Sequence, residues 1–472
     1  MTAILAVDQG TSGTKAVVHD DEDGVLAVAE EAVQPDYLPD GGVEVDPESL
    51  WRSVLVAGRR AAEAAGRPLA GIALANQGET VLAWDPDTGR PLGPALVWQD
   101  RRAQALLTEL PDTRWVPDRT GLPVDPYFSA PKLAWLRRHR THSGVVTTSD
   151  SWLIHRLCGA FVTDASTASR SLLTGLDDAA WDEQLLELFG LGDELLPRIV
   201  ACDEVVGSTD AFGITMPVAG LLVDQQAALL GQGCLNPGDA KCTFGTGAFL
   251  LTQCGPTPRR SGTGLAASVA WRLRGRLEYC LDGQVYAAGS AIGWLRRLGV
   301  IASAAEVDAR IAESSGAALA VPALAGLAAP WWRADATGSV SGLGLATGSG
   351  ELIRAVIDGI AAQLAELVDA AATDLGRPLD GLRVDGGLTQ CHSLMQAVAD
   401  LAQVRLDVYP GEHATALGVA AAGRLALQQS HTIADAVPAA TSQRSFLPRW
   451  APDQAESFRA RWRAAVEREL RR

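Results

Sequence analysis

The sequence has 472 residues, a length that predicts two to four domains and excludes a single small binding module. Lysine and arginine total 40 and aspartate and glutamate total 56, so the net charge is −16. Such a chain repels phosphate backbones and anionic lipid, which argues against nucleic acid and membranes as partners. With 47% apolar and 20% charged residues, it has the composition of a globular protein that buries a large core.

The N-terminal segment, the uncharged stretches and the cysteines indicate the cellular compartment in which we expect the protein. Residues 1–8 lack a cationic region, and their apolar run is too short for a signal peptide. The uncharged stretch 314–332 is broken by two glycines and two prolines, so we do not expect it to span a membrane. The seven cysteines include no C-x-x-C pair and form an odd set, which argues against a zinc ribbon and a disulfide framework. We expect a cytoplasmic protein with reduced thiols, and a homo-oligomer is compatible with the sequence.

The first third of the chain mixes strand, turn and helix signals. Apolar runs separated by turn residues predict a three-stranded meander over residues 3–7, 15–19 and 25–33. Asp46 followed by Pro47 then offers the start of a helix, whose apolar spacing continues to residue 65. Further strands are predicted at 72–75 and 95–98. These alternating elements indicate mixed α/β layers.

The second half repeats the opening pattern. Residues 240–251 read as a strand, a Gly-Thr-Gly turn and a returning strand, much like the opening of the chain. Turn residues concentrate between 230 and 238, so we place a boundary there and predict domains at 1–230 and 231–472. Periodicity predicts later elements as follows: a helix at 351–375, a strand at 382–385, a helix at 390–402, a strand at 404–409, a helix at 413–427 and a basic C-terminal helix.

Two glycine-containing turns have the composition of phosphate loops. Residues 8–15 read Asp-Gln-Gly-Thr-Ser-Gly-Thr-Lys, where turn amides and hydroxyls can cradle phosphate while Asp8 holds a metal ion and Lys15 adds a charge. Taken alone, this turn is better explained as a plain polar hairpin. The second turn at 245–247 favours the functional interpretation, because two facing hairpins would grip one nucleotide. Neither is a Walker loop or a Rossmann fingerprint.

Two further aspartates follow predicted strands. Residues 385–387, Asp-Gly-Gly, lie between a strand and a helix and would let backbone approach a nucleotide, although an ordinary turn fits as well. Asp224 follows an apolar run and precedes a helix, as expected of an exposed functional carboxylate or of a helix N-cap. The histidines show no metal-ligand spacing and no G-x-S-x-G element occurs, so zinc and hydrolase chemistry lack support.

Two long motifs connect the chain with a known family. Residues 127–139, Tyr-Phe-Ser-Ala-Pro-Lys-Leu-Ala-Trp-Leu-Arg-Arg-His, and residues 338–358, with Gly-Ser-Val-Ser-Gly-Leu at their start, satisfy both signatures of the FGGY carbohydrate kinases. The chain resembles that family over essentially its whole length, and within it most resembles the glycerol kinases. The resemblance implies an α/β fold of two actin-like, ribonuclease-H-like domains with an interdomain catalytic cleft.

The resemblance also implies roles for individual residues. Asp224 would be the general base that takes the proton of a terminal hydroxyl as it attacks the γ-phosphorus of ATP. Asp8 and Asp224 would lie beside Mg²⁺. Nucleotide-binding positions are matched by Thr11, Ser12, Gly13, Lys15, Thr246, Gly247, Gly289 and Gly387. Two positions on the adenine side differ from glycerol kinases, Gly293 and Cys391, which puts nucleotide affinity or base preference in question.

The substrate positions match less completely. The resemblance assigns substrate contacts to Glu79, Trp98, Tyr127, Asp224, Gln225 and Phe249. Residues 76–80 read Asn-Gln-Gly-Glu-Thr, so Gly78 replaces an arginine that glycerol kinases have there. Loss of that side chain removes up to five hydrogen-bond donors, and we expect it to free space for a longer polyol or keto sugar.

These observations predict an ATP-dependent kinase that phosphorylates a terminal hydroxyl of glycerol or a similar small polyol or sugar, with Mg²⁺ and an aspartate base. One alternative is a kinase of a four- or five-carbon substrate such as erythritol or xylulose. Another is a sugar and nucleotide sensor without turnover, which the retention of both Asp8 and Asp224 disfavours.

Overall fold

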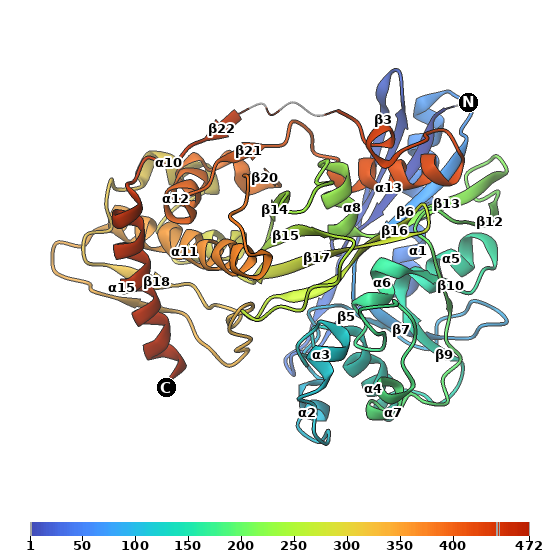
Figure 1. The fold of residues 1–472 in the computed structure, drawn as a ribbon, viewed down its shortest axis with the longest axis horizontal. Coiled ribbons are helices and arrows are strands. Elements are labelled where there is room, and N and C mark those ends of the chain that lie inside the picture. The colour runs from blue at the N-terminus through green and yellow to red at the C-terminus, as the bar shows by residue number, and fades with distance from the viewer. Residues whose placement is uncertain (1, 440–441, 443, 472) are drawn as a thin grey trace.

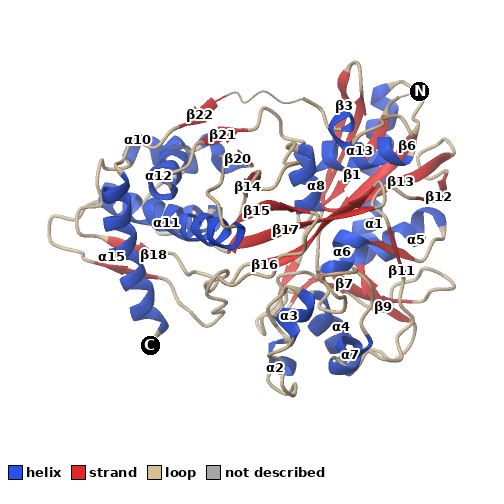
Figure 2. Ribbon diagram, in the orientation of Figure 1, coloured by secondary structure: helices blue, strands red, loops and turns tan. Residues whose placement is uncertain are grey.

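The molecule consists of two α/β halves that lie side by side (Figure 1). The computed structural model describes residues 2–439, 442 and 444–471. Strands of the first half gather on the side of the N-terminus, whereas the second half ends in the C-terminal helix α15 (Pro452–Leu470) at the opposite side. Figure 2 shows that each half combines a central sheet with covering helices. The α/β fold class is therefore confirmed.

The central sheet of the first half has the strand order β12-β13-β6-β1-β2-β3. Its strands are β1 (Ile4–Gln9), β2 (Gly13–Asp20), β3 (Gly24–Ala32), β6 (Gly71–Asn76), β12 (Val205–Thr209) and β13 (Met216–Val223). β1, β2 and β3 form the predicted antiparallel meander, and β6 pairs in parallel with both β1 and β13. Three neighbouring strands thus end at the same edge of the sheet.

The second half contains a sheet of similar design, with the order β16-β17-β15-β14-β20-β21-β22. Its strands are β14 (Ala240–Phe244), β15 (Ala248–Gly255), β16 (Ala266–Leu273), β17 (Arg276–Val285), β20 (Leu382–Asp385), β21 (Leu406–Val408) and β22 (Arg444–Phe446). β14 and β15 form a hairpin, and β14 pairs in parallel with β20. An antiparallel hairpin beside a parallel strand is also the arrangement of β1, β2 and β6, so the predicted internal repeat is confirmed.

The remaining elements form smaller sheets and the helical layers. The smaller sheets contain β4 (Asp36–Tyr37), β5 (Val43–Val45), β7 (Val81–Trp84), β8 (Ala95–Leu96) and β9 (Val145–Thr148), then β10 (Val162–Asp164) with β11 (Arg198–Val200), and β18 (Leu319–Val321) with β19 (Ser339–Ser341). The first half's helices are α1 (Pro47–Ala65), α2 (Gln104–Leu107), α3 (Val116–Thr120), α4 (Ser129–His139), α5 (Ser149–Cys158), α6 (Ala165–Ser169), α7 (Glu183–Leu188) and α8 (Asp224–Gly231). The second half adds α9 (Gly289–Arg297), η1 (Ala304–Glu306), α10 (Val307–Arg310), α11 (Ser349–Leu375), η2 (Gly387–Gln390), α12 (His392–Ala402), α13 (Ala414–Ala426) and α14 (Ile433–Ala436).

Helix α1 forms where the sequence predicts it, for local reasons. The Asp46 side chain accepts a hydrogen bond from the Glu48 amide, Pro47 occupies the first turn, and Gly66 ends the helix in a left-handed conformation. The buried stripe contains Leu50 and Val54, at the spacing expected of one helix face.

Some boundaries differ from the prediction because distant segments decide them. The helix predicted at 390–402 begins at His392, after the short 3-10 turn η2. The Asp308 carboxylate accepts hydrogen bonds from the amides of His392 and Ser393, at 3.0 and 2.8 Å. A side chain from elsewhere in the chain therefore caps this helix. Among the described residues, no helix has both the length and the apolar character needed to cross a membrane.

Helix α13 belongs to the second half of the sequence but packs on the first half. It contacts α8 and the strands β13, β6 and β1, and Figure 1 shows it beside β6. Its buried residues Ala416 and Val419 share an apolar cluster with Ile4 and Ala73. The two halves are consequently joined by a helix, as well as by the chain between β13 and β14.

Candidate active site

The first sheet carries polar side chains at the edge where its parallel strands end. Asp8 lies near the end of β1, Asn76 ends β6, and Asp224 directly follows β13. Register aligns these positions, since Gln9 and Val223 both pair with Asn76. The topology therefore places Asp8 and Asp224 together at the carboxyl ends of the parallel strands, the edge of α/β sheets at which ligands bind most often.

Two hairpin turns project from the two halves. In the first, the Gly10 amide donates to the Gly13 carbonyl at 2.9 Å, and in the second the Gly245 amide donates to the Gly247 carbonyl at 2.8 Å. Ser12 and Thr246 are exposed at the tips. The amides and hydroxyls at these tips are therefore accessible to a ligand.

The second turn is held by the start of α9. The Gly289 amide donates to the Gly245 carbonyl at 3.1 Å, and the Ser290 amide donates to the Thr246 carbonyl at 3.0 Å. A Cβ atom at Gly289 would lie 2.6 Å from the Gly245 oxygen, so only glycine permits this approach. Gly387 begins η2 after β20 and has open space around its Cα. Both positions that the sequence predicts to contact nucleotide thus border the second hairpin or its neighbouring strand.

Lys15 lies on β2, opposite Asp8 on β1. Its Nζ is 3.0 Å from a carboxylate oxygen of Glu30, and its side chain is one-quarter exposed. The lysine charge lowers the pKa of Asp8, although burial dominates and raises it. Lys15 therefore contributes positive potential at this edge of the sheet while it is held by Glu30.

Two carboxylates raise the pKa of Asp8 where the halves meet. Burial and then the charge of Asp224 raise the pKa of Asp8 to about 7, and Asp385 adds to the increase. Burial raises the pKa of Asp224 to about 6, against the charge of Lys241. Closely placed carboxylates of this kind disfavour each other's ionised form until a cation joins them.

Asp8 and Asp224 have the composition of a magnesium site that phosphate and water complete, and not of a metal site formed by protein ligands alone. Among the described residues, no group of three or more His, Cys, Asp or Glu side chains is placed to hold a metal ion by itself. Mg²⁺ is commonly held by one or two carboxylates together with substrate phosphates and water. Asp8 and Asp224 fit that donor set, and burial is the main cause of their raised pKa values, to which the charge of Asp224 adds at Asp8.

A small cavity lies beside Asp224 and is lined by residues from both halves. Its volume is about 120 Å³, and its lining residues are Thr11, Gly78, Glu79, Trp98, Tyr127, Arg170, Val223, Asp224, Gln225 and Phe249. The structure therefore brings together every substrate position predicted from the sequence. The cavity is far smaller than the roughly 300–1,000 Å³ typical of sites for drug-sized ligands, so its ligand is small.

Aromatic side chains form one wall of this cavity. The Trp98 ring lies edge-on to Tyr127 and to Phe249, with ring centroids 5.7 and 6.0 Å apart. The indole Nε1 of Trp98 donates to Thr11 Oγ1 at 2.9 Å, which links this wall to the first hairpin turn. Edge-to-face packing holds such rings in fixed orientations, so the apolar side of the cavity is preformed.

Gly78 lines the cavity, but the space next to its Cα is narrow. A Cβ atom at Gly78 would lie 2.9 Å from Cγ2 of Val223 and 3.9 Å from Nε of Arg170. A side chain at position 78 would therefore begin in close contact with Val223 and next to another guanidinium. Only the tertiary structure reveals this, because residues 78, 170 and 223 are far apart in the sequence.

Sequence reasoning missed three buried charged residues at the site, Arg170, Lys241 and Asp282. Arg170 ends α6, donates through Nε to Glu79 and through Nη1 to Asp282 at 2.5 Å. Lys241 Nζ donates to Gln225 Oε1 at 2.5 Å. The sequence does contain one indication of Arg170, which is the only charged residue in the segment 165–176. A lone charge in such a stretch indicates a buried partner.

Comparison with known families identifies the chain. The model of the N-terminal domain of the FGGY carbohydrate kinases matches residues 3–231, and that of the C-terminal domain matches residues 240–427. The chain belongs to the FGGY family of carbohydrate kinases. Similar proteins include the glycerol kinases of Alkalilimnicola ehrlichii and Thermus brockianus, which are 42% and 40% identical to this FGGY kinase. Each alignment covers 99% of this chain and 98% of the relative.

Solved structures of FGGY kinases share the fold. Plasmodium falciparum glycerol kinase with ADP superposes with a TM-score of 0.91 at 29% identity, covering 100% of this chain and 98% of that chain. A ligand-bound xylulose kinase from Lactobacillus acidophilus gives a TM-score of 0.88 at 21% identity, covering 99% and 97%. The predicted actin-like, ribonuclease-H-like architecture of this FGGY kinase is therefore confirmed.

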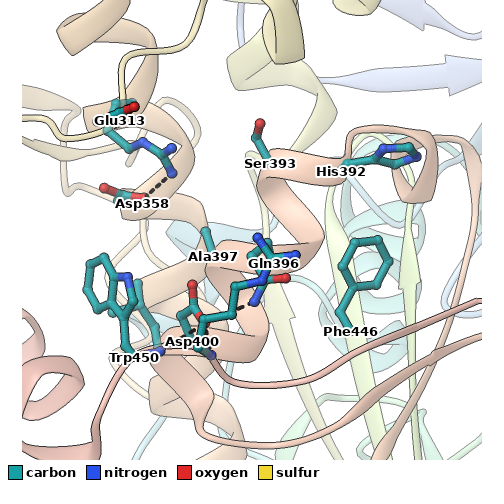
Figure 3. A pocket seen from close by; sticks show the side chains of 12 residues that line it. Glu313, Asp358, His392, Ser393, Gln396, Ala397, Asp400, Phe446 and Trp450 are labelled. Carbon is teal, nitrogen blue, oxygen red and sulfur yellow. Dashed lines mark hydrogen bonds and ion pairs between the residues drawn. The ribbon is translucent and has the colours of Figure 1, made fainter.

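This FGGY kinase also has a larger cavity, of about 460 Å³, between α11, α12 and residues 446–450 (Figure 3). Arg354 lies 3.5 Å from Asp358, and Asp400 accepts hydrogen bonds from the Gln396 side chain at 3.0 Å and the Arg449 amide at 2.6 Å. None of its lining residues is a predicted site residue. These contacts join the two helices to the C-terminal segment, which indicates a structural role for Asp400.

Proposed function

We propose that this FGGY kinase transfers the γ-phosphoryl group of ATP to a terminal hydroxyl of glycerol or a closely similar polyol. The observation that carries this proposal is the position of Asp224, which lines the small cavity and lies beside Asp8 at the edge of the first sheet. The relatives that cover nearly the whole chain are named glycerol kinases, which supports the same substrate class.

In this proposal Asp224 is the general base. Burial sets its pKa at about 6, so the carboxylate is mostly ionised near pH 7 and still accepts a proton readily. Its Oδ1 accepts the Gln225 amide at 2.7 Å, which fixes the carboxylate at the start of α8. The attacking hydroxyl would lose its proton to Asp224 as the new P–O bond forms, while ADP leaves.

The two hairpin turns supply the proposed nucleotide contacts. Thr11, Ser12, Gly13 and Lys15 would contact phosphate from the first half, and Thr246 and Gly247 from the second. Gly289 and Gly387 would border the nucleoside. Asp8 and Asp224 would hold Mg²⁺, which neutralises phosphate charge when bound. The net charge of −16 makes such local neutralisation necessary.

The candidate substrates glycerol, erythritol and xylulose differ in size. The cavity of about 120 Å³ and the Val223 side chain beside Gly78 favour a compact polyol over erythritol or xylulose. The sensor alternative is disfavoured because Asp8 and Asp224 are both in place at the cavity edge. A Cβ atom at Gly293 would lie 3.8 Å from Nη1 of Arg297, and Cys391 is buried, so base preference should be measured with ATP and GTP.

We also propose that residues 1–230 and 231–472 act as the two kinase domains, with α13 as the element that crosses between them. All seven cysteines lie within the described residues and are unpaired, which supports action in a reducing compartment such as the cytoplasm.

The deciding experiment compares the wild type with Asp224→Asn. Wild type with ATP and Mg²⁺ should release ADP in the presence of glycerol, in a panel that also contains erythritol, xylulose and ribulose. Asp224→Asn should lower kcat by about 10²- to 10⁴-fold, the typical cost of removing a general base, while nucleotide affinity changes little.

Nucleotide binding to both proteins should be measured by calorimetry, which separates lost chemistry from lost folding. An active Asp224→Asn protein would refute the base assignment. Turnover only with xylulose or erythritol would replace glycerol by the longer substrate, and nucleotide binding without turnover on any member of the panel would support the sensor.

A further inference from the structure

Arg170 is a buried cation in the wall of the substrate cavity, and no signature or predicted site residue includes it. Its side chain is only 4% exposed. It extends from the C-terminal end of α6 between two carboxylates, Glu79 in the first half and Asp282 on β17 in the second. The guanidinium therefore connects a substrate-binding position with the other half of the molecule.

The orientation of Arg170 is fixed before any ligand arrives. Its guanidinium lies 5.7 Å from the ring centroid of Tyr127 and 5.8 Å from that of Phe128. Glu79 is held beside it in a left-handed conformation, with φ of 55°. Such a conformation is unfavourable for a residue other than glycine and is often found where a side chain must point in a functional direction.

Some N–H groups of Arg170 are not used by acceptors in the protein and can bind a ligand. A guanidinium carries five N–H groups. Nε is used by Glu79 and Nη1 by Asp282, whereas Nη2 has no hydrogen-bond partner within the part of the chain that the structure describes. Nη2 is not among the fully buried polar atoms that lack a partner, and Arg170 lines the cavity, so this donor is available to a molecule bound there.

Gly78 makes this arrangement possible. The position where glycerol kinases have arginine carries no side chain, and a Cβ there would already approach Nε of Arg170 to 3.9 Å and Val223 to 2.9 Å. A side chain at position 78 would therefore start in close contact with Val223 and next to the Arg170 guanidinium. Among the residues that line the cavity, the cation is Arg170.

We propose that Arg170 is a substrate-binding residue that, together with Glu79, binds one hydroxyl group of the polyol. Glu79 offers an acceptor and Arg170 a donor side by side, which is the pattern that a hydroxyl satisfies because it both donates and accepts. This inference rests on the proposed function and adds to it the residue that replaces the missing arginine in substrate recognition.

The test uses Arg170→Lys with a matched control. Lysine keeps a positive charge for Glu79 and Asp282 but lacks the planar set of donors. The KM for glycerol should rise about 10- to 100-fold, the effect of one lost hydrogen bond from a charged donor, while kcat changes less than about threefold. The control is Arg459→Lys, since Arg459 also lies buried between two carboxylates, Glu366 and Asp369, but lines neither cavity.

A second measurement separates binding from folding. The affinities of wild type and Arg170→Lys for glycerol, 1,2-propanediol and 1,3-propanediol should be compared, as substrates or as inhibitors. If Arg170 binds a hydroxyl, the variant loses affinity for glycerol but not for the diol that lacks that hydroxyl. A purely structural arginine would lower the melting temperature and weaken all three compounds equally.

The outcomes distinguish this inference from the proposed function. An unchanged KM, or equal loss for glycerol and both diols, overturns the role of Arg170 while leaving the kinase intact. Failure of the wild type to phosphorylate or bind any polyol in the panel overturns the proposed function and this inference with it.

Discussion

At the residue scale, the proposed base Asp224 is subject to two opposing influences. Burial raises its pKa to about 6, and the charge of Lys241 opposes the increase. Lys241 is itself fully buried and donates to Gln225 Oε1 at 2.5 Å and to Thr243 Oγ1 at 2.9 Å. The lysine comes from β14 in the second half, so the ionisation of the base depends on how the two halves meet.

Lys241→Met tests this dependence. Without the positive charge, the pKa of Asp224 should rise, and the acidic limb of the pH profile of kcat/KM for the polyol should move from about pH 6 to higher pH. Lys241→Arg retains the charge and should leave the limb near its original position. A limb that stays in place in Lys241→Met would show that the lysine does not act on the base.

At the element scale, helix α13 docks on β2 through a buried polar contact. Arg424 is fully buried, its Nη2 contacts Nδ1 of His19, and its Nε lies 3.3 Å from Asp21. This contact requires the neutral form of His19, with Nδ1 as acceptor. Burial and then the charge of Arg424 lower the pKa of His19 to about 4, against the nearby Asp21 and Asp20.

The stability of the protein should therefore depend on pH through His19. Between pH 4 and 6.5 the unfolded chain binds a proton at His19 that the folded protein does not, so this group makes the free energy of unfolding rise with pH in that window. His19→Gln should flatten the slope, measured by urea unfolding at several pH values. The exposed His142→Gln serves as control, and equal slopes in all three proteins would contradict the assignment.

At the scale of the whole molecule, close packing between α8 and α13 holds the halves together. A Cβ atom at Gly418 on α13 would lie 1.8 Å from the Ala227 carbonyl oxygen on α8, and one at Gly231 would lie 2.0 Å from the Ala414 oxygen. Glycines at both positions allow the two helices to approach this closely. Asp224 is the first residue of α8, so the same contact positions the proposed base.

Gly418→Ala should separate these helices. We expect a loss of about 1–3 kcal/mol in the free energy of unfolding, as for overpacked cores, and a fall in kcat of roughly 10- to 100-fold because the base is displaced. Denaturant unfolding and steady-state kinetics measure the two effects. Gly344→Ala is the control, since a Cβ there meets no atom within 4 Å. Unchanged kcat in a destabilised Gly418→Ala protein would separate α13 from catalysis.

Much of the fold follows from local patterns in the sequence. The meander, α1, the second hairpin and α11 lie where apolar periodicity, turn residues and the Asp46 cap predict them. Boundaries that distant groups determine were less predictable. The start of α12 depends on Asp308, and β21 is only Leu406–Val408 where a strand at 404–409 was predicted.

The sequence by itself determined the family, the twin hairpins and most of the side chains that line the substrate cavity, because these depend on short segments whose residue types and order are characteristic. The tertiary structure alone decided what surrounds them. Residues 78, 170, 223 and 282 are separated by up to about two hundred positions, yet their side chains and backbone share one small volume. Steric exclusion and the pairing of buried charges act between atoms in space, and no local pattern records which distant residues will meet.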